Sequence, residues 1–173
     1  MAENRTIEEL YELIDDIEIA MLTTRRPDGR LVSRPMATQE RAAGADLWFV
    51  TSTDTEKLDE LATDPNINLA YYDNKSREYV SVSGTARTVG DREKIRELYK
   101  PDWKAWFPGD GANSGTPDDP RIVLIAVDAK SVVYLKVDKP RPVVMFEVVK
   151  GMVTGETPDV GDVRRVSGAG LRS

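Results

Sequence analysis

LWFVTSTDTEK, residues 47–57, is the segment that indicates the fold most clearly. Its first five residues combine aromatic, aliphatic and β-branched side chains, which favour a strand. Hydroxyl side chains crowd residues 51–55, and helix-forming residues occupy 56–61 before the break at Pro65. The sequence therefore predicts a strand that enters a helix through a hydroxyl-rich turn.

The segments on either side of this stretch alternate apolar and polar residues with the period of a β-strand. This alternation at residues 17–21 and the turn at 27–29 predict a hairpin over residues 17–39. Further strands are expected at 66–73, 78–89, 122–127 and 132–135, and short helices at 6–15 and 91–99. Turn signals at regular spacing, without long helices between strands, favour a mainly β protein that is α+β by helix content: an antiparallel barrel with peripheral helices.

Three details refine this architecture. Pro35 cannot donate to a sheet ladder, so its strand is expected at an edge or a bulge. Gly84 predicts a bulge or a sharp bend. Residues 143–150 fit either a strand or a helix. We expect one domain over residues 1–150 and a C-terminal tail over 151–173, whose Gly, Asp, Arg and Ser content allows mobility.

The amino-acid composition excludes several kinds of catalytic site. The 173 residues include no cysteine and no histidine, so thiol nucleophiles, histidine triads and the commonest zinc ligand are absent. A net charge of -6 argues against nucleic acid as a partner. No apolar run reaches the roughly 20 residues of a membrane span, so we expect a cytoplasmic protein. Asp118 and Asp119 have no metal-site spacing, and we expect them to be solvated.

The turn before the helix at 56–61 has the features of an anion site. Its hydroxyls, the positive charge of Lys57 and the free N–H groups of a helix start all attract phosphate. The alternative is that Thr53 and Glu56 form a capping box and that Lys57 is solvated. Arg34 favours the phosphate interpretation, because it supplies a second cation from the adjacent strand.

The loop at 101–120 contains three large aromatic side chains, Trp103, Trp106 and Phe107. They form either a satellite cluster that caps the barrel or a wall beside a flat heterocycle. The sequence leaves both interpretations open.

Several motifs together resemble one protein family. They are Arg34-Pro35-Met36, residues 47–51 followed by Lys57, residues 79–84, and residues 104–108 with 119–120. From about residue 5 to residue 137 the chain resembles the pyridoxamine 5'-phosphate oxidase-like FMN-binding split-barrel superfamily. Within it, the chain is most similar to the general stress protein 26 type.

The resemblance implies a six-stranded antiparallel split barrel that forms a homodimer with FMN at the subunit interface. It also implies roles for individual residues. The phosphate would be held by Arg34, Thr51, Ser52 and Lys57, and the isoalloxazine would be lined by Pro35, Met36 and Val50 and approached from the second chain by Tyr79 and Trp106. The chain departs from the true oxidases at Glu56, where they have an arginine, and it lacks the histidine of their Arg-x-His substrate motif.

The function expected from the resemblance is a stress-linked, flavin-dependent oxidoreductase of unknown substrate. The flavin would carry the hydride or electrons, which a barrel without histidine permits. The alternatives are a non-catalytic flavin-binding or sensor protein, a reductase that uses the deazaflavin F420, and a barrel without any cofactor.

Overall fold

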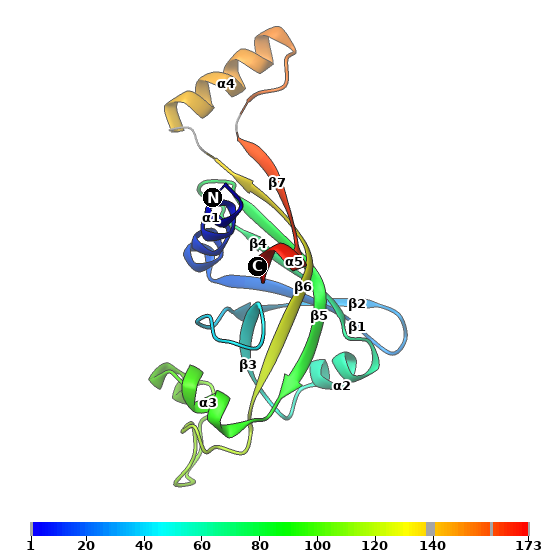
Figure 1. The fold of residues 1–173 in the computed structure, drawn as a ribbon, viewed down its shortest axis with the longest axis vertical. Helices are drawn as coiled ribbons and strands as arrows, with labels where there is room; N and C mark the ends of the chain where they lie inside the picture. Colours follow the sequence, from blue (N-terminus) through cyan, green and yellow to red (C-terminus); the bar gives the residue numbers. More distant parts are fainter. Residues whose placement is uncertain (1, 138–140, 160, 173) are drawn as a thin grey trace.

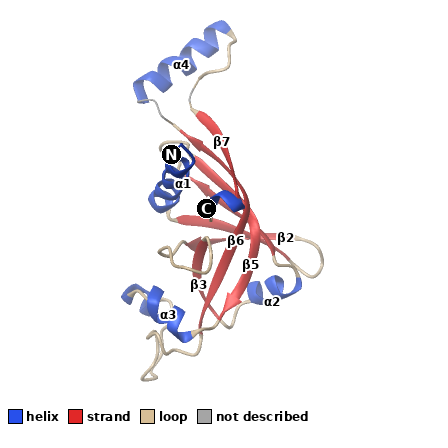
Figure 2. Cartoon of the chain, viewed as in Figure 1, coloured by secondary structure: helices blue, strands red, loops and turns tan. Residues whose placement is uncertain are grey.

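The computed structural model describes residues 2–137, 141–159 and 161–172. The strands are β1 (Ile19–Arg25), β2 (Leu31–Ala37), β3 (Leu47–Ser52), β4 (Asn66–Tyr72), β5 (Tyr79–Val89), β6 (Ile122–Lys136) and β7 (Asp162–Ser167). The helices are α1 (Ala2–Ile17), α2 (Glu56–Thr63), α3 (Arg92–Leu98), α4 (Arg141–Thr154) and α5 (Gly168–Leu171), with the 3-10 helix η1 (Pro101–Ala105). Figure 1 and Figure 2 show the strands crossing one another in a strongly twisted sheet, with the helices around it.

All strands belong to one antiparallel sheet of seven, in the order β2-β1-β4-β5-β6-β3, with β7 also paired to β6. The long strand β6 explains why the barrel is split. Its residues 122–127 pair with β3 and its residues 131–136 pair with β7, so two different strands share one edge of β6. A single bridge between Thr38 and Phe49 brings the end of β2 to β3. The sheet therefore curls into a barrel without closing fully.

The predicted antiparallel split barrel is confirmed, with one strand more than the six expected. The additional strand, β7, comes from the part of the chain predicted to be a tail, and the predicted boundary at residue 150 lies inside α4. Residues 143–150 are therefore helical. Mobility of the segment 151–173 stays a prediction.

Local breaks in pairing account for two further differences. The strands predicted at 122–127 and 132–135 are one strand, because Lys130 is accommodated as a bulge opposite Ser83 and Gly84. The bulge predicted at Gly84 is thus confirmed. Pro35 lies on the edge strand β2, as expected, and the register of β2 with β1 is unbroken there.

Two hydrophobic clusters stabilise the fold. The main core lies inside the barrel and includes Leu22, Phe49, Leu69 and Tyr71, with α1 contributing Leu10, Leu13 and Ile14. The second cluster consists of Trp48, Ile95, Leu98, Trp103, Phe107, Ile122, Leu124 and Ala126. Of the two interpretations that the sequence left open, the satellite cluster holds for Trp103 and Phe107, whereas Trp106 is 77% exposed. None of the helices in the described ranges has both the length and the apolar content that crossing a membrane requires.

The loop before β6 is fixed by Asp119, so the prediction that this residue is solvated is wrong. Its carboxylate is buried. It accepts hydrogen bonds from Arg121 Nη2 at 2.7 Å and from the backbone N–H of Gly115 at 2.8 Å. These bonds, above all those from the Arg121 side chain, hold the pKa of Asp119 well below its ordinary value of 3.8.

Asp119→Asn is expected to reduce the acid sensitivity of the fold. Because the pKa of Asp119 is depressed in the folded state, its stabilising effect is fully present above the unfolded pKa and is lost as the pH falls through the folded pKa. The wild-type free energy of unfolding should therefore fall more steeply than that of the variant between about pH 5 and pH 2. Urea titrations at several pH values measure this, with Asp118→Asn, an exposed neighbour, as the control. Parallel curves for wild type and Asp119→Asn would contradict the assignment.

Candidate functional site

Two cations that are distant in sequence come together beside the third strand. Lys57, in the first turn of α2, donates a hydrogen bond from Nζ to Oγ1 of the buried Thr51 at the end of β3, at 2.8 Å. Burial lowers the pKa of Lys57, and the nearby positive charge of Arg34 on β2 lowers it further. Two like charges that repel in a partly buried place are a setting that a bound anion would stabilise.

The guanidinium of Arg34 is held by two residues that were not predicted as site residues. Its Nη1 donates to Thr24 Oγ1 at 2.6 Å and its Nη2 donates to Glu60 Oε2 at 2.7 Å. Thr24 Oγ1 in turn donates to the same Glu60 oxygen at 2.5 Å. The Glu60 side chain is 4% exposed and that of Arg34 is 20% exposed. Arg34 therefore points into the barrel end covered by α2, although β2 is an edge strand.

Glu60 sets the charge of this site. Burial raises the pKa of its carboxyl, but the hydrogen bonds from Thr24 and Arg34, with the Arg34 charge, outweigh burial, and the pKa lies below its ordinary value. Glu60 is thus an anion that neutralises one of the two cations, so the cluster has one net positive charge. A guanidinium has five N–H donors, and Arg34 uses two of them here. The remaining donors and the Lys57 ammonium can still bind an oxyanion.

A helical spacing in the sequence could have located Glu60. Lys57, Glu60 and Leu61 recur at i, i+3 and i+4, so a helix that turns Leu61 toward the core also brings the other two toward the barrel. In the structure α2 buries both Glu60 and Leu61.

The helix start beside these residues differs from the predicted capping box. The N-cap of α2 is Thr55 rather than Thr53, and no side chain caps the helix. Thr55 Oγ1 instead donates to the carbonyl oxygen of Ser52 at 3.2 Å, and Ser52 Oγ accepts from the backbone N–H of Asp54 at 3.3 Å. The first N–H groups of α2 are consequently not used by a side-chain cap, which leaves them able to bind an anion.

The other residues predicted on these strands lie on different sides of the sheet. Met36 packs against the main core, and Val50 packs against the second cluster. Pro35 is exposed on the outside of the barrel. The structure thus brings together the side chains of Arg34, Thr51 and Lys57, with Ser52 adjacent. Only backbone atoms lie near this cluster at the other three predicted positions, Pro35, Met36 and Val50.

Tyr79 and Trp106 lie away from the Arg34–Lys57 cluster within one chain. Tyr79 begins β5, which is separated from β2 by β1 and β4 in the sheet. Trp106 ends η1 beside α3. Neither position brings its side chain to the cluster within this chain.

The outside of the barrel near Pro35 is unusually apolar for a sheet surface. Antiparallel sheets with one solvated face normally present polar residues there. Here Ile19 is 45% exposed, Met21 40% and Tyr72 59%. We call this surface the outer sheet face; it consists of Ile19, Met21, Pro35, Ala37, Ala70 and Tyr72. Tyr79 pairs with Tyr72 and therefore borders the same face.

The curled antiparallel sheet defines a split β-barrel, and the Arg34–Lys57 cluster lies at one end of it. Comparison with known proteins gives the family directly. The family model described as pyridoxamine 5'-phosphate oxidase like matches residues 5–159, and the chain belongs to this family.

Individual relatives agree with this assignment. The chain is 35% identical over 168 residues to Protein bli-3 of Neurospora crassa, covering 95% of this chain and 80% of bli-3. Among solved structures it is similar to a putative general stress protein 26 from Jannaschia sp. CCS1, with 27% identity, a TM-score of 0.72 and coverage of 96% of this chain and 99% of the other. A general stress FMN/FAD binding protein from Xanthomonas citri is 25% identical, with a TM-score of 0.60 over 73% of this chain and 84% of its own. The predicted resemblance to the general stress protein 26 type is thereby confirmed.

Proposed function

We propose that this protein binds FMN and acts as a flavin-dependent oxidoreductase. The observation that carries the proposal is the meeting of Arg34 and Lys57, in which the charge of one lowers the pKa of the other beside an uncapped helix start. This arrangement suits the phosphate of a flavin mononucleotide. The FMN/FAD binding of the Xanthomonas citri protein, which has the same fold, supports a flavin as the ligand.

The side chains divide the work of holding the cofactor. Lys57, Thr51, Ser52 and the free donors of Arg34 would bind the phosphate, and Glu60 would hold Arg34 in its orientation. The backbone of β2 at Pro35 and Met36, with that of Val50, would lie along the isoalloxazine. When bound, FMN would supply the redox chemistry, and the chain would supply position and charge. The absence of histidine leaves the substrate motif of the true oxidases unformed, so we do not propose pyridoxamine phosphate as the substrate.

We further propose that the protein is a cytoplasmic homodimer and that the second copy completes the flavin site. Pro35, on the outer sheet face, and Tyr79, at its border, would then lie in an interface, where an apolar sheet surface is removed from water. Trp106, which is 77% exposed in one chain, would find a partner in the same way.

The test is a titration of the purified protein with FMN, read by quenching of flavin fluorescence, followed by anaerobic reduction with NADH or NADPH. Saturable binding and a reducible flavin support the proposal. Protein that is colourless and ignores added FMN would overturn flavin binding. Protein that binds FMN which no donor reduces and no acceptor reoxidises would be a flavin-binding or sensor protein instead. Displacement of FMN by F420 at lower concentration would identify F420 as the ligand.

Lys57→Ala is expected to weaken FMN binding by about 1–3 kcal/mol, the usual value of a charge-assisted hydrogen bond. The fluorescence titration gives the dissociation constant directly. Lys57→Arg, which keeps the charge, should lose less, and Lys130→Ala, which removes an exposed lysine on β6, should lose nothing. An unchanged affinity in Lys57→Ala would place the phosphate elsewhere.

A further inference from the structure

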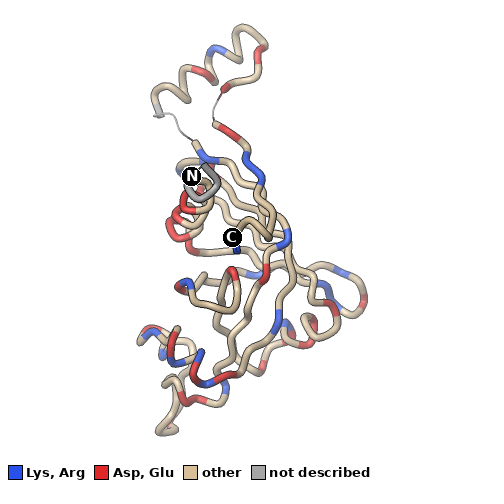
Figure 3. Tube along the Cα trace, in the orientation of Figure 1, with Lys and Arg blue, Asp and Glu red and all other residues tan. Residues whose placement is uncertain are grey.

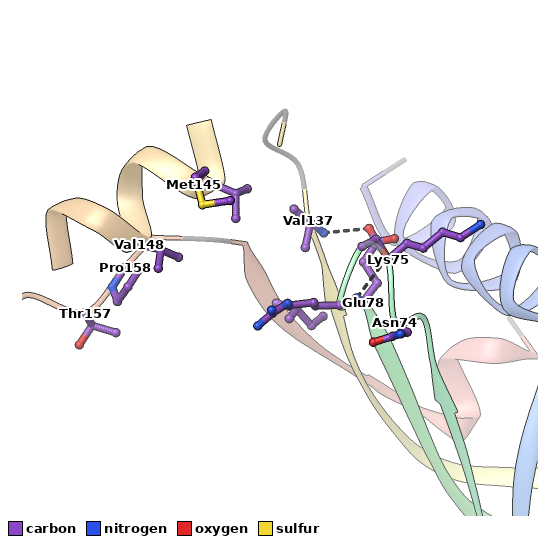
Figure 4. Close-up of a pocket in the computed structure, with 12 residues that line it drawn as sticks. Asn74, Lys75, Glu78, Val137, Met145, Val148, Thr157 and Pro158 are labelled. Atoms are coloured by element: carbon purple, nitrogen blue, oxygen red, sulfur yellow. Dashed lines mark hydrogen bonds between the residues drawn. The ribbon is translucent and has the colours of Figure 1, made fainter. Parts of the chain in front are cut away.

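The helix α4 stands away from the barrel (Figure 1), and most of its residues are apolar. The side toward the barrel lines a hollow of about 920 Å³, which separates the helix from the turn between β4 and β5. Figure 4 shows Met145 and Val148 on the helix side of this hollow and Val137, Lys75 and Glu78 on the barrel side. The helix is thus held over the barrel without packing closely on it.

Next to this side, and sharing Met145 with it, runs an apolar stripe of the kind that normally faces a core. Its residues recur at i, i+1, i+4, i+7 and i+8, the spacing of one face of a helix. They are Met145 (66% exposed), Phe146 (66%), Val149 (52%), Met152 (81%) and Val153 (82%). We call these five residues the α4 stripe. An exposed apolar stripe of this size marks a surface that packs against a partner.

The area of the stripe is a large part of what each partner buries in a protein dimer. The exposed fractions correspond to roughly 600 Å² of apolar side-chain surface, against about 800 Å² per partner in a standard interface. Val163, 52% exposed on β7, adds to this surface.

Charge permits a second copy of the same chain to approach here. The chain has a net charge of -6, so two copies repel over most of their surface. Between residues 142 and 154, however, the only charged residues are Glu147 and Lys150, which balance each other. Figure 3 shows this scarcity of charge along α4, in contrast to the acidic residues along α1.

The outer sheet face extends as far as the hollow beneath α4. In the sheet register Tyr79 pairs with Leu135, and Leu135 pairs with Val163, so the apolar border of the outer sheet face runs onto β7. Leu135 also lines the hollow beneath α4. A second copy that covers the outer sheet face would therefore lie next to α4.

We propose that α4 is a clasp whose stripe packs on a second copy of this chain. The inference rests on the homodimer proposed above and adds the surface that holds the two copies together. It assigns a role to residues 141–154, which lie outside the barrel and contribute nothing to the Arg34–Lys57 cluster.

The experiment compares dimerisation of the wild type with that of Val149→Glu/Met152→Glu by sedimentation velocity over a range of concentrations. Because two carboxylates would have to be buried without partners, the dimer dissociation constant should rise about 100-fold or more. Ala112→Glu/Asn113→Glu is the matched control, since it adds the same charge at exposed positions in the loop before β6. The four substituted side chains are all exposed in one chain, so circular dichroism should show both variants folded.

A second measurement uses the absence of cysteine in the chain. Met152→Cys labelled with an environment-sensitive dye should shift to the blue with increasing protein concentration, with the same midpoint as dimerisation. The same dye on Ala112→Cys should not shift. A dye on α4 that ignores dimerisation, or a double variant that dimerises like the wild type, would overturn the clasp. Wild type that stays monomeric and binds phosphatidylcholine vesicles would also overturn it.

The test of the clasp can fail independently of the test of flavin binding. A wild type that dimerises through α4 but binds no FMN would support the clasp and overturn the proposed function. A protein that binds FMN and dimerises without α4 would support the proposed function and overturn the clasp.

Discussion

Glu60→Ala is expected to lower the free energy of unfolding by about 3 kcal/mol, because it leaves a partly buried arginine without its counter-charge. Arg34 and Thr24 both direct hydrogen bonds at Glu60 Oε2, at 2.7 and 2.5 Å. Alanine would leave the Arg34 guanidinium desolvated and the Thr24 hydroxyl without an acceptor. Urea unfolding followed by tryptophan fluorescence measures the change.

Two comparisons isolate the pair from the helix that contains it. Glu56→Ala removes an exposed glutamate from the same helix and should change the free energy of unfolding by no more than about 0.5 kcal/mol. In a double-mutant cycle, Glu60→Ala should lower the free energy of unfolding much less in an Arg34→Met background, because no arginine charge is then left without its partner. Equal costs in the two backgrounds would mean that the ion pair does not form in solution.

The sequence predicted part of this cluster. Arg34, Lys57 and Thr51 were predicted to converge, from the adjacent strands and from the hydroxyl-rich turn, and the structure brings them together. Glu60 was not predicted, because a glutamate in a short helix is usually solvated and only the packing of α2 on the barrel buries it. Local patterns locate the elements, whereas the partner of a buried charge depends on tertiary packing.

The two faces of the sheet also depend on tertiary packing that local sequence patterns do not specify. The alternation of Ile19 and Met21 correctly predicts a strand, but these apolar residues are exposed, and Ala20 and Leu22 between and beside them are buried. A strand that is apolar on both faces fits a core on one side and an interface on the other. Sequence periodicity cannot separate the two, because both remove the side chain from water.

The end of the chain was predicted least well. The segment 162–167 has arginines at two successive positions and no clean alternation, so nothing local marks it as a strand. It becomes β7 because the second half of β6 offers an unpaired edge. Conversely, β6 looked like two strands because Lys130 and Ser131 interrupt the apolar pattern at the bulge.

Gly84→Ala is expected to lower the free energy of unfolding by about 3 kcal/mol, because the added methyl group would overlap backbone atoms of β6. A Cβ at this position would collide with the carbonyl oxygen of Asp128 and would lie 3.0 Å from Ala129 Cα. These atoms belong to the bulge that lets β6 pair along its whole length with β5, so they can move only if the ladder shifts.

Gly90→Ala is the matched control, since nothing lies within 4 Å of its Cβ, and it should change stability by no more than about 0.5 kcal/mol. Urea unfolding measures the free energy of unfolding of the two variants. A Gly84→Ala protein as stable as Gly90→Ala would show that the close approach at the bulge is absent in solution. A loss confined to Gly84→Ala would show that β5 and β6 approach closely at the bulge in solution and that this close approach stabilises the fold.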